Sequence, residues 1–244
     1  MDFLAKLKNK WDERKFVCVG LDKGNFEFDK NIIDQTADLV CAYKPQAAYY
    51  SDLDLKQTAD YLKKHHPDIP VLLDAKRGDI GSTNKAYVKA IFDELGVDAV
   101  TVHPYLGEES LKPFIDRQDK GIIVLVRTSN PGAGEFQDLL VNDKPLYQVV
   151  AEHVKEWNKN NNLAVVVGAT YPEELKIVRG IVGDIPILVP GIGAQGGDLK
   201  ATIENGLDSK KGGLIINSSR GIIFADNPRE ACQALHEQIT KTIS

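Results

Sequence analysis

The sequence is poor in cysteine, and the few cysteines it has follow no metal-binding or disulfide pattern. Three occur in 244 residues: Cys18, Cys41 and Cys232. Cys18 and Cys41 lie inside apolar, strand-like runs, and none of the three has the spacing of a zinc site. A secreted domain held together by disulfides usually carries many cysteines in an even number. The sequence therefore predicts neither a disulfide framework nor a bound structural metal.

The chain also lacks long apolar runs and an excess of positive charge. No segment approaches the stretch of about 20 apolar residues that crosses a bilayer, and the first residues, MDFLAKLKNKWDERK, do not read as a signal peptide. The net charge is −5, with Lys and Arg scattered among acids, which disfavours nucleic-acid binding. A small anionic ligand stays compatible, because a local site can be positive on an acidic protein. We expect a cytoplasmic protein with no nucleic-acid or membrane partner.

What the chain does contain is a regular alternation of short β-rich runs and helix-like stretches. The β-rich runs are apolar on both faces, as buried parallel strands are. Helical periodicity appears between them, for example in residues 51–65, 82–95 and 146–160. The candidate strands are Phe16–Leu21, Leu39–Lys44, Pro70–Ala75, Asp98–His103, Gly121–Arg127, Leu163–Gly168, Ile185–Val189 and Gly213–Asn217.

Eight such units predict an α/β fold, a (β/α)8 TIM barrel, for which this chain length is normal. An open doubly wound sheet is the alternative, but the turn Gly20–Gly24 after the first strand lacks the glycine fingerprint of that fold. An extra N-terminal helix is predicted to plug the bottom of the barrel with its apolar residues Phe3, Leu4, Leu7 and Trp11. With no linker or repeat, residues 1–244 are expected to form a single domain.

Charged residues follow the ends of the first three candidate strands. Strand one ends at Asp22, strand two at Lys44, and strand three in Asp74 and Lys76. Catalytic groups of barrel enzymes come from these carboxyl ends. Side chains alternate along a strand, so Asp74 and Lys76 are expected to share one side. A structural ion pair at the rim is the alternative, but several charges crowded together are costly to desolvate unless they serve a site.

Asp79 lies beyond strand three, in a loop that opens the next helix, and Thr83 follows one helical turn later. On the residues alone, Asp79 is as well explained as a helix cap as it is by a place in the site. His103, at the end of strand four, is favoured as a buried, hydrogen-bonded histidine. The connection from Thr128 to Pro145 is long for a barrel, and such loops are usually lids or binding loops.

Two glycine-rich segments follow strands seven and eight. They are Pro190–Gly197 and Asn217–Gly221. Barrel enzymes often bind phosphate between these two loops, where backbone N–H groups approach the anion closely. Arg220 could add a charge-assisted hydrogen bond. The alternative is that the glycines only turn the chain.

These motifs together resemble one family, orotidine 5'-phosphate decarboxylase. The resemblance rests on VGLD in strand one, YKPQ after strand two, DAKRGDIGST after strand three, SNPG after strand five, PGIGAQGG after strand seven and SSRG near the end. It covers nearly the whole chain in the expected order. It implies a carbon–carbon lyase that converts orotidine 5'-phosphate to uridine 5'-phosphate in pyrimidine biosynthesis, with no metal and no organic cofactor.

The resemblance also implies roles for the charged residues. Asp74 would lie against the substrate carboxylate, and Lys76 would deliver a proton to C6 after carbon dioxide leaves. Lys44 and Asp79 would complete an alternating Lys–Asp–Lys–Asp array. Asp79 and Thr83 would come from the partner subunit of a homodimer.

The remaining implied contacts concern the rest of the nucleotide. Asp22 and Lys44 would hold ribose hydroxyls, and Ser129 would meet the pyrimidine edge. Gln195 and Arg220 would clamp the phosphate, helped by the backbone near Gly193. Further substrate contacts are expected in the same two glycine-rich segments, from Pro190 and Ser219.

Two other functions compete with this interpretation. One is a metal-dependent decarboxylase of a keto-sugar phosphate on the same barrel. Such relatives share D-x-K-x-x-D but place an acidic metal ligand at the end of strand two, where Lys44 would repel a cation. The other is a non-catalytic phosphate-binding barrel, in which the Asp–Lys array has no obvious purpose.

Overall fold

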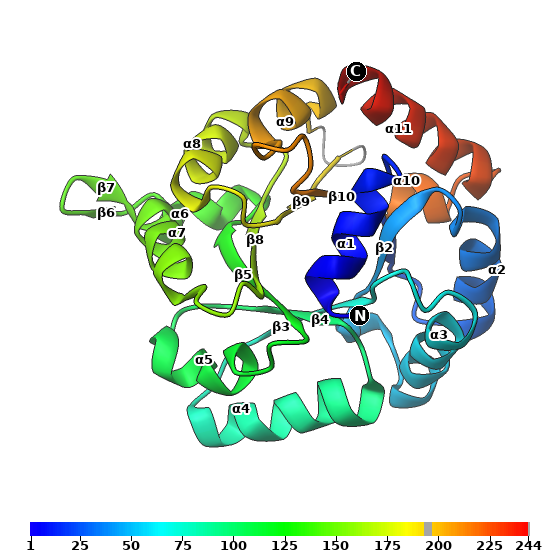
Figure 1. Cartoon of the computed structure of the whole chain (residues 1–244), viewed down its shortest axis with the longest axis horizontal. Helices are drawn as coiled ribbons and strands as arrows, with labels where there is room; N and C mark the ends of the chain where they lie inside the picture. Colours follow the sequence, from blue (N-terminus) through cyan, green and yellow to red (C-terminus); the bar gives the residue numbers. More distant parts are fainter. Residues whose placement is uncertain (193–196, 244) are drawn as a thin grey trace.

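The computed structural model, which describes residues 1–192 and 197–243, forms a barrel of eight parallel strands surrounded by helices (Figure 1). The strand order is β2-β1-β10-β9-β8-β5-β4-β3. Parallel bridges from Tyr43 to Val71 and from Gln46 to Asp74 join β2 to β3 and close the ring. The strands are β1 (Val17–Leu21), β2 (Val40–Pro45), β3 (Leu72–Arg77), β4 (Ala99–Val102), β5 (Gly121–Arg127), β8 (Leu163–Val167), β9 (Ile187–Pro190) and β10 (Leu214–Ser218). The predicted (β/α)8 fold is confirmed.

Helices connect the strands in turn and form the outer layer. Several begin at a side-chain cap: the Ser51 hydroxyl accepts from the Asp54 N–H at the start of α3, and Asn25 and Asp198 cap α2 and α9 in the same way. The longer helices are α1 (Phe3–Asp12), α2 (Phe26–Thr36), α3 (Asp52–His65), α4 (Gly81–Val88), α5 (Gly107–Ile115), α7 (Leu146–Trp157), α8 (Pro172–Val182), α9 (Leu199–Gly206) and α11 (Pro228–Ile243). The shorter ones are η1 (Ala47–Tyr49), η3 (Pro131–Ala133), α6 (Gly134–Gln137) and α10 (Arg220–Ile223).

One helix differs from the expected regular form. The stretch predicted as a helix over residues 82–95 is α4 followed by a π-helical segment, η2 (Lys89–Leu95). The N–H of Gly96 bonds to the carbonyl of Ile91, five residues back. The wider turn keeps Ile91 and Phe92 buried against the barrel, which a periodicity of apolar residues does not reveal.

The N-terminal helix closes one end of the barrel, as predicted. Phe3 and Leu7 of α1 belong to the apolar cluster inside the strands, and the Phe3 ring lies over Gly121 at the start of β5. Figure 1 shows α1 inside the ring of outer helices. Because α1 covers the amino ends of the strands, the interior is open only toward their carboxyl ends.

The strand residues that face the interior are small or aliphatic near α1. The inner cluster includes Cys18, Ala42, Leu72, Ala99 and Ala164. Each large aliphatic side chain buried in such a core stabilises the fold by roughly 1.5–3 kcal/mol. Polar residues replace these apolar ones toward the carboxyl ends of the strands, which leaves space for a ligand there.

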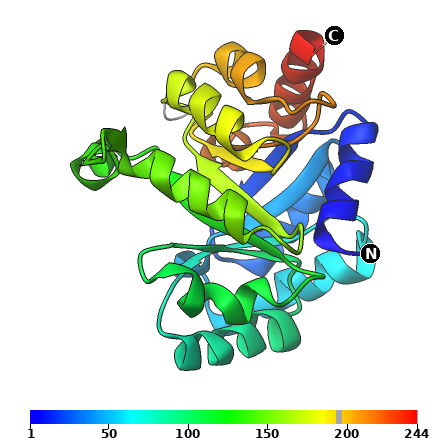
Figure 2. The same ribbon diagram turned by 60° about the vertical axis from the view of Figure 1, so that its left-hand side comes forward.

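The long connection after β5 has structure of its own. It contains η3, α6 and a small hairpin of β6 (Leu140–Val141) and β7 (Lys144–Pro145). Asn142 and Asp143 turn this hairpin with positive φ angles of 50° and 64°. The hairpin stands away from the barrel (Figures 1 and 2).

Among the described helices, none combines the length and apolar character needed to cross a bilayer.

Candidate active site

A cavity of about 480 Å³ opens at the carboxyl ends of the barrel strands. Its position matches the face where barrel enzymes carry their active sites. The residues around it combine both signs of charge with hydroxyl and amide groups. They are Asp22, Lys44, Gln46, Tyr49, Asp74, Lys76, Thr101, Leu125, Thr128, Ser129, Asn130, Val166, Leu188, Pro190, Gly191, Ile192, Asn217, Ser219, Arg220 and Gly221.

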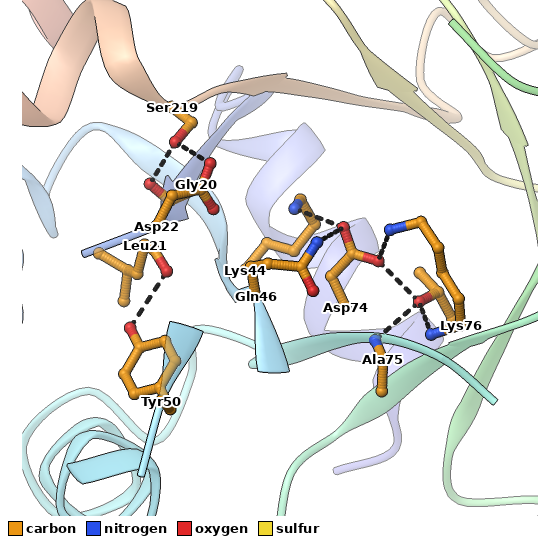
Figure 3. A network of polar contacts seen from close by, with 11 residues as sticks. Gly20, Leu21, Asp22, Lys44, Gln46, Tyr50, Asp74, Ala75, Lys76 and Ser219 are labelled. Atoms are coloured by element: carbon orange, nitrogen blue, oxygen red, sulfur yellow. Dashed lines mark hydrogen bonds and ion pairs between the residues drawn. The ribbon is translucent and has the colours of Figure 1, made fainter. Parts of the chain in front are cut away.

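Asp74 is the centre of the charged part of the cavity (Figure 3). Its Oδ2 accepts from Lys44 Nζ at 2.9 Å and from Gln46 Nε2 at 3.4 Å. Its Oδ1 accepts from Lys76 Nζ at 2.6 Å and from Thr101 Oγ1 at 2.9 Å. The Lys44 side chain is 6% exposed and that of Lys76 is 47% exposed, so the Lys76 ammonium is the one that a ligand can reach.

The charges in this cluster support one another. Burial alone raises the pKa of the Asp74 carboxyl, but the ammonium groups of Lys44 and Lys76 outweigh burial and hold that pKa well below its ordinary value. Burial also opposes the charge on Lys44, yet Asp74 and Asp22 raise the pKa of its ammonium. Both groups of the Lys44–Asp74 pair are therefore ionised at neutral pH.

An irregularity in β3 brings Lys76 to this position. Leu73 pairs with Val100 and Arg77 with Val102, so three residues of β3 oppose Thr101 alone. Lys76 sits in the left-handed region with φ of 46°, which strains a residue that has a side chain. The Thr101 hydroxyl accepts the N–H groups of both Ala75 and Lys76. The expectation that Asp74 and Lys76 share one side is met, but through this bulge rather than through strand alternation.

Asp22 and Ser219 meet at the ends of β1 and β10 (Figure 3). The Ser219 hydroxyl donates to Asp22 Oδ2 at 2.5 Å and lies 3.1 Å from the Gly20 carbonyl. A Cβ on Gly20 would lie 2.8 Å from the Cβ of Ser219, so only glycine permits this approach. Among the described residues, Asp22 Oδ1 and Asn217 Oδ1 are buried without a hydrogen-bond partner. Both belong to residues that line the cavity, which leaves two acceptors for the hydroxyl groups of a ligand.

The two glycine-rich segments lie on one rim of the cavity. Pro190, Gly191 and Arg220 line it. Arg220 is exposed, and no carboxylate in the described part of the chain forms an ion pair with it. The structure thus provides a cation and glycine backbone at the rim where a phosphate was predicted. Gly193 and Gln195, which were also predicted to contact phosphate, lie outside the described residues.

The structure places Asp79 and Thr83 apart from the other predicted site residues, because neither lines the cavity of its own chain. Asp79 does not cap the helix either. The N-cap of α4 is Ile80, which makes no side-chain capping bond, and within the described part of the chain Asp79 Oδ1 accepts from the adjacent Ile80 N–H alone. The partly buried ring of His103 lies against Gly78. Its Nε2 is within hydrogen-bonding distance of the Gly78 carbonyl oxygen, at 3.1 Å. His103 thus supports the turn that carries Asp79.

Sequence reasoning did not select several residues that the structure brings into the site. Thr101 and Gln46 both donate to Asp74, and Thr128, Asn130 and Asn217 line the cavity. Alternation along β4 from the inward-facing Ala99 would have placed Thr101 inside the barrel. Gln46 lies in the YKPQ motif, but its partner Asp74 is 28 residues away. That contact depends on how β2 and β3 pair, which local sequence does not specify.

No cluster of three His, Cys, Asp or Glu side chains suited to a metal ion occurs in residues 1–192 and 197–243. The end of β2 carries Lys44, whose Nζ occupies the space beside Asp74 Oδ2 that a cation would need. The donor set around Asp74 consists of two ammonium groups, an amide and a hydroxyl. These residues do not fit a divalent metal, since ammonium groups repel it.

A (β/α)8 barrel with a lysine–aspartate cluster in the mouth and a glycine-bordered cationic rim defines a barrel enzyme for a small anionic ligand. Comparison with known proteins gives the family. Residues 15–235 match the family described as Orotidine 5'-phosphate decarboxylase / HUMPS. The chain therefore belongs to the orotidine 5'-phosphate decarboxylase family.

Individual relatives agree over the full chain. The orotidine 5'-phosphate decarboxylase of Janthinobacterium sp. (strain Marseille) is 47% identical, over 99% of this chain and 97% of that protein. The one from Cellvibrio japonicus (strain Ueda107) is 48% identical, over 96% and 94% of the two chains. The solved OMP decarboxylase of Leishmania donovani has a TM-score of 0.93 at 39% identity, covering 100% of this chain and 99% of that one. The L. donovani UMP synthase has a TM-score of 0.95 at 41% identity, and this chain spans 57% of its length.

Proposed function

We propose that this protein decarboxylates orotidine 5'-phosphate to uridine 5'-phosphate in pyrimidine biosynthesis, without a metal or organic cofactor. The observation that carries the proposal is the Lys44–Asp74–Lys76 cluster, with the Lys76 ammonium reachable from the cavity and 2.6 Å from Asp74. The relatives named as orotidine 5'-phosphate decarboxylases, at 45–48% identity, support it.

The chemistry breaks a carbon–carbon bond and leaves a carbanion at C6 of the pyrimidine. The Lys76 ammonium stabilises that developing negative charge and then donates a proton to C6. Asp74 holds Lys76 in place and stands beside the departing carboxylate. Repulsion between Asp74 and the substrate carboxylate supplies only part of the lowering of the activation barrier. Enzymes lower such barriers by roughly 8–23 kcal/mol, and one pair of like charges does not provide that much.

The rest of the cavity fits the remainder of the nucleotide. Asp22 and Lys44 bind ribose hydroxyls, and the unpartnered Asp22 Oδ1 is an acceptor ready for one. Ser129 faces the pyrimidine. Arg220 binds the phosphate together with Pro190, Ser219 and the segment that contains Gly193 and Gln195. Phosphate binding far from C6 contributes binding energy that favours the transition state.

Asp79 and Thr83 complete the site of a second subunit in a homodimer. They do not line the cavity of their own chain. Ile80, which lies between them in the chain, is 59% exposed, so this turn is open to contact with a second chain. In the dimer, Lys44, Asp74, Lys76 and the partner's Asp79 form the alternating array.

The whole chain, residues 1–244, acts as one catalytic domain in the cytoplasm. All three cysteines are buried free thiols, which fits a reducing compartment. Burial raises the pKa of the Cys18 thiol to about 12, so it stays protonated and inert.

The test is the absorbance of orotidine 5'-phosphate after protein is added, with and without a chelator. We expect conversion to uridine 5'-phosphate at the same rate in both samples, since ammonium groups occupy the site. Activity that a chelator abolishes and magnesium restores would favour the metal-dependent alternative. No conversion at high protein concentration would favour a non-catalytic phosphate-binding barrel.

A further inference from the structure

Arg127 carries a buried charge on the outer side of the barrel wall. The pairing of β5 with β8 shifts after Leu125: Leu125 pairs with Val166, whereas Arg127 pairs with Val167. Val166 belongs to the inner cluster, and Val167 packs in the layer between strands and helices. The Arg127 side chain accordingly lies toward α7 and α8, where the residue is 2% exposed.

The groups around Arg127 do not explain its burial by a stabilising ion pair. Its guanidinium lies 4.0 Å from the ring centre of Tyr171 and 6.0 Å from that of Tyr147. Nη2 donates to Asp138 at 3.1 Å and Nη1 to Gln137 at 3.3 Å, while Nε is buried without a partner among the described residues. Asp138 is 50% exposed. A charge buried against a half-exposed partner adds little net stability.

The bond to Gln137 continues to the cavity wall. Gln137 Oε1 also accepts the Thr128 N–H, and Gln137 Nε2 donates to Thr128 Oγ1, both at 2.9 Å. The Thr128 hydroxyl donates to Asn130 at 2.7 Å. Between them Ser129 lies so close to Gly168 that a Cβ there would be 2.7 Å from the Ser129 Cβ. Thr128, Ser129 and Asn130 all line the cavity.

The outer part of the same connection, the β6–β7 hairpin, does not hold the Thr128–Asn130 segment in place. The β6–β7 hairpin stands away from the barrel (Figure 2), and Leu139 and Leu140 are exposed. The anchor of the inner part is therefore the bonded chain from Arg127 through Gln137 to Thr128. We propose that Arg127 is a positioning residue that sets the Thr128–Asn130 wall against the base of the nucleotide. This inference rests on the proposed function, because that function assigns the base to this wall.

The main experiment uses Arg127→Met, which keeps an apolar stem and removes the charge. We expect the Tm to stay within about 3 °C of the wild type, because no buried counter-charge is left behind. We expect kcat/KM for orotidine 5'-phosphate to fall about ten- to a hundredfold, as displaced wall residues misalign the base. Calorimetry should show a matching loss of affinity for uridine 5'-phosphate and unchanged affinity for ribose 5-phosphate, which has no base.

Further variants at Gln137, Arg127 and Arg117 sharpen the result. Gln137→Ala should reproduce the loss, and the double variant should be no worse than either single one, since both act through the same chain of bonds. If Arg127→Met fails to fold, Arg127→Lys decides the matter, because it keeps a positive charge but lacks the fork that reaches both Gln137 and Asp138, and it should show the same loss of affinity for uridine 5'-phosphate. Arg117→Met is the matched control. Arg117 likewise pairs with an aspartate, Asp93, and lies over an aromatic ring, that of Phe92, but among the described residues neither of these partners bonds to a residue that lines the cavity.

Two outcomes overturn the inference. One is an affinity for uridine 5'-phosphate and a kcat/KM within about twofold of the wild type in a folded variant at Arg127. The other is an equal loss of affinity for uridine 5'-phosphate and ribose 5-phosphate, which indicates general damage rather than misplacement of the base wall. A wild type that binds uridine 5'-phosphate but decarboxylates nothing contradicts the proposed function instead, and the two binding affinities still test Arg127.

Discussion

At the residue scale, hydrogen bonds fix the orientation of the Asp74 carboxylate. Two ammonium groups, one amide and one hydroxyl donate to its two oxygens. A carboxylate held by this many donors does not rotate away when a ligand arrives, so its negative charge is preorganised beside Lys76. Of the two lysines, only Lys76 has an ammonium that is substantially exposed to the cavity.

A second buried carboxylate, Asp29, behaves in the opposite way. Its Oδ2 accepts from Tyr50 at 2.5 Å and from Thr58 at 2.9 Å, and no Lys, Arg or His of the described residues forms an ion pair with it. Burial raises the pKa of Asp29 to about 6, although both hydroxyls lower it. Between its ordinary pKa and about 6, the folded state binds a proton that the unfolded state releases. Stability therefore falls as pH rises through this window, and the penalty is complete above it.

Asp29→Asn tests this pH dependence. The free energy of unfolding of the variant relative to the wild type should increase by about 2 kcal/mol between roughly pH 4.5 and pH 7.5, because the ionised carboxyl is removed. Denaturant titrations at the two pH values measure it. Asn in place of the exposed Asp226 is the control and should show no such change. A relative stability of Asp29→Asn that is equal at both pH values would contradict the assignment.

At the element scale, the β3 bulge is the structure that makes the site. Thr101 on β4 is 1% exposed, and its hydroxyl accepts from two backbone N–H groups of β3 while donating to Asp74. The strained backbone of Lys76, with φ of 46°, is held by these bonds.

Thr101→Val removes the hydroxyl and keeps the shape. We expect a loss of about 2–4 kcal/mol in the free energy of unfolding, because two buried N–H groups lose their acceptor, and a fall in kcat as Lys76 shifts. Urea denaturation and steady-state kinetics measure the two effects. Thr202→Val is the control: Thr202 is fully buried, and its hydroxyl has no partner among the described residues. An equal, small effect in both variants would refute the role of Thr101.

The arrangement of elements was largely predictable, whereas the bulge was not. Each of the eight predicted strands agrees with the structure to within two residues at either end, because continuous apolar runs define buried parallel strands. Asp22, Lys44, Asp74 and Lys76 were found because charges follow those runs. The conformation of Lys76 and the role of Thr101 depend on how β3 and β4 pair, and the buried charge of Arg127 depends on the register of β5 and β8. Local residue patterns do not encode such pairings.

At the scale of the whole molecule, the proposed function draws on two chains, because it assigns Asp79 and Thr83 to the site of a partner subunit. Asp79 and Thr83 lie outside the cavity of their own chain, and no residue pattern within the chain could show where their side chains act. Their assignment to a partner's site is consistent with the exposed Ile80 between them in the chain, and it requires a dimer.

Subunit mixing tests this shared site. Lys76→Ala and Asp79→Asn homodimers should each be nearly inactive, and their mixture should recover activity, because one site of a mixed dimer carries neither change. One subunit carries a mass tag, so that mixed dimers can be detected by their mass. Activity is measured once subunit exchange has been shown in this way. If subunits exchange and activity does not recover, Asp79 does not act in the partner subunit's site.

The proton-donating role of Lys76 is the central claim, and Lys76→Ala tests it most directly when turnover and uridine 5'-phosphate binding are measured on the same sample. We predict a folded variant that binds uridine 5'-phosphate about as well as the wild type and loses at least about 10³-fold in kcat, since charge stabilisation and proton donation are both removed. Lys155→Ala, on the exposed face of α7, should retain full activity. Turnover of Lys76→Ala comparable to that of the wild type would contradict the account.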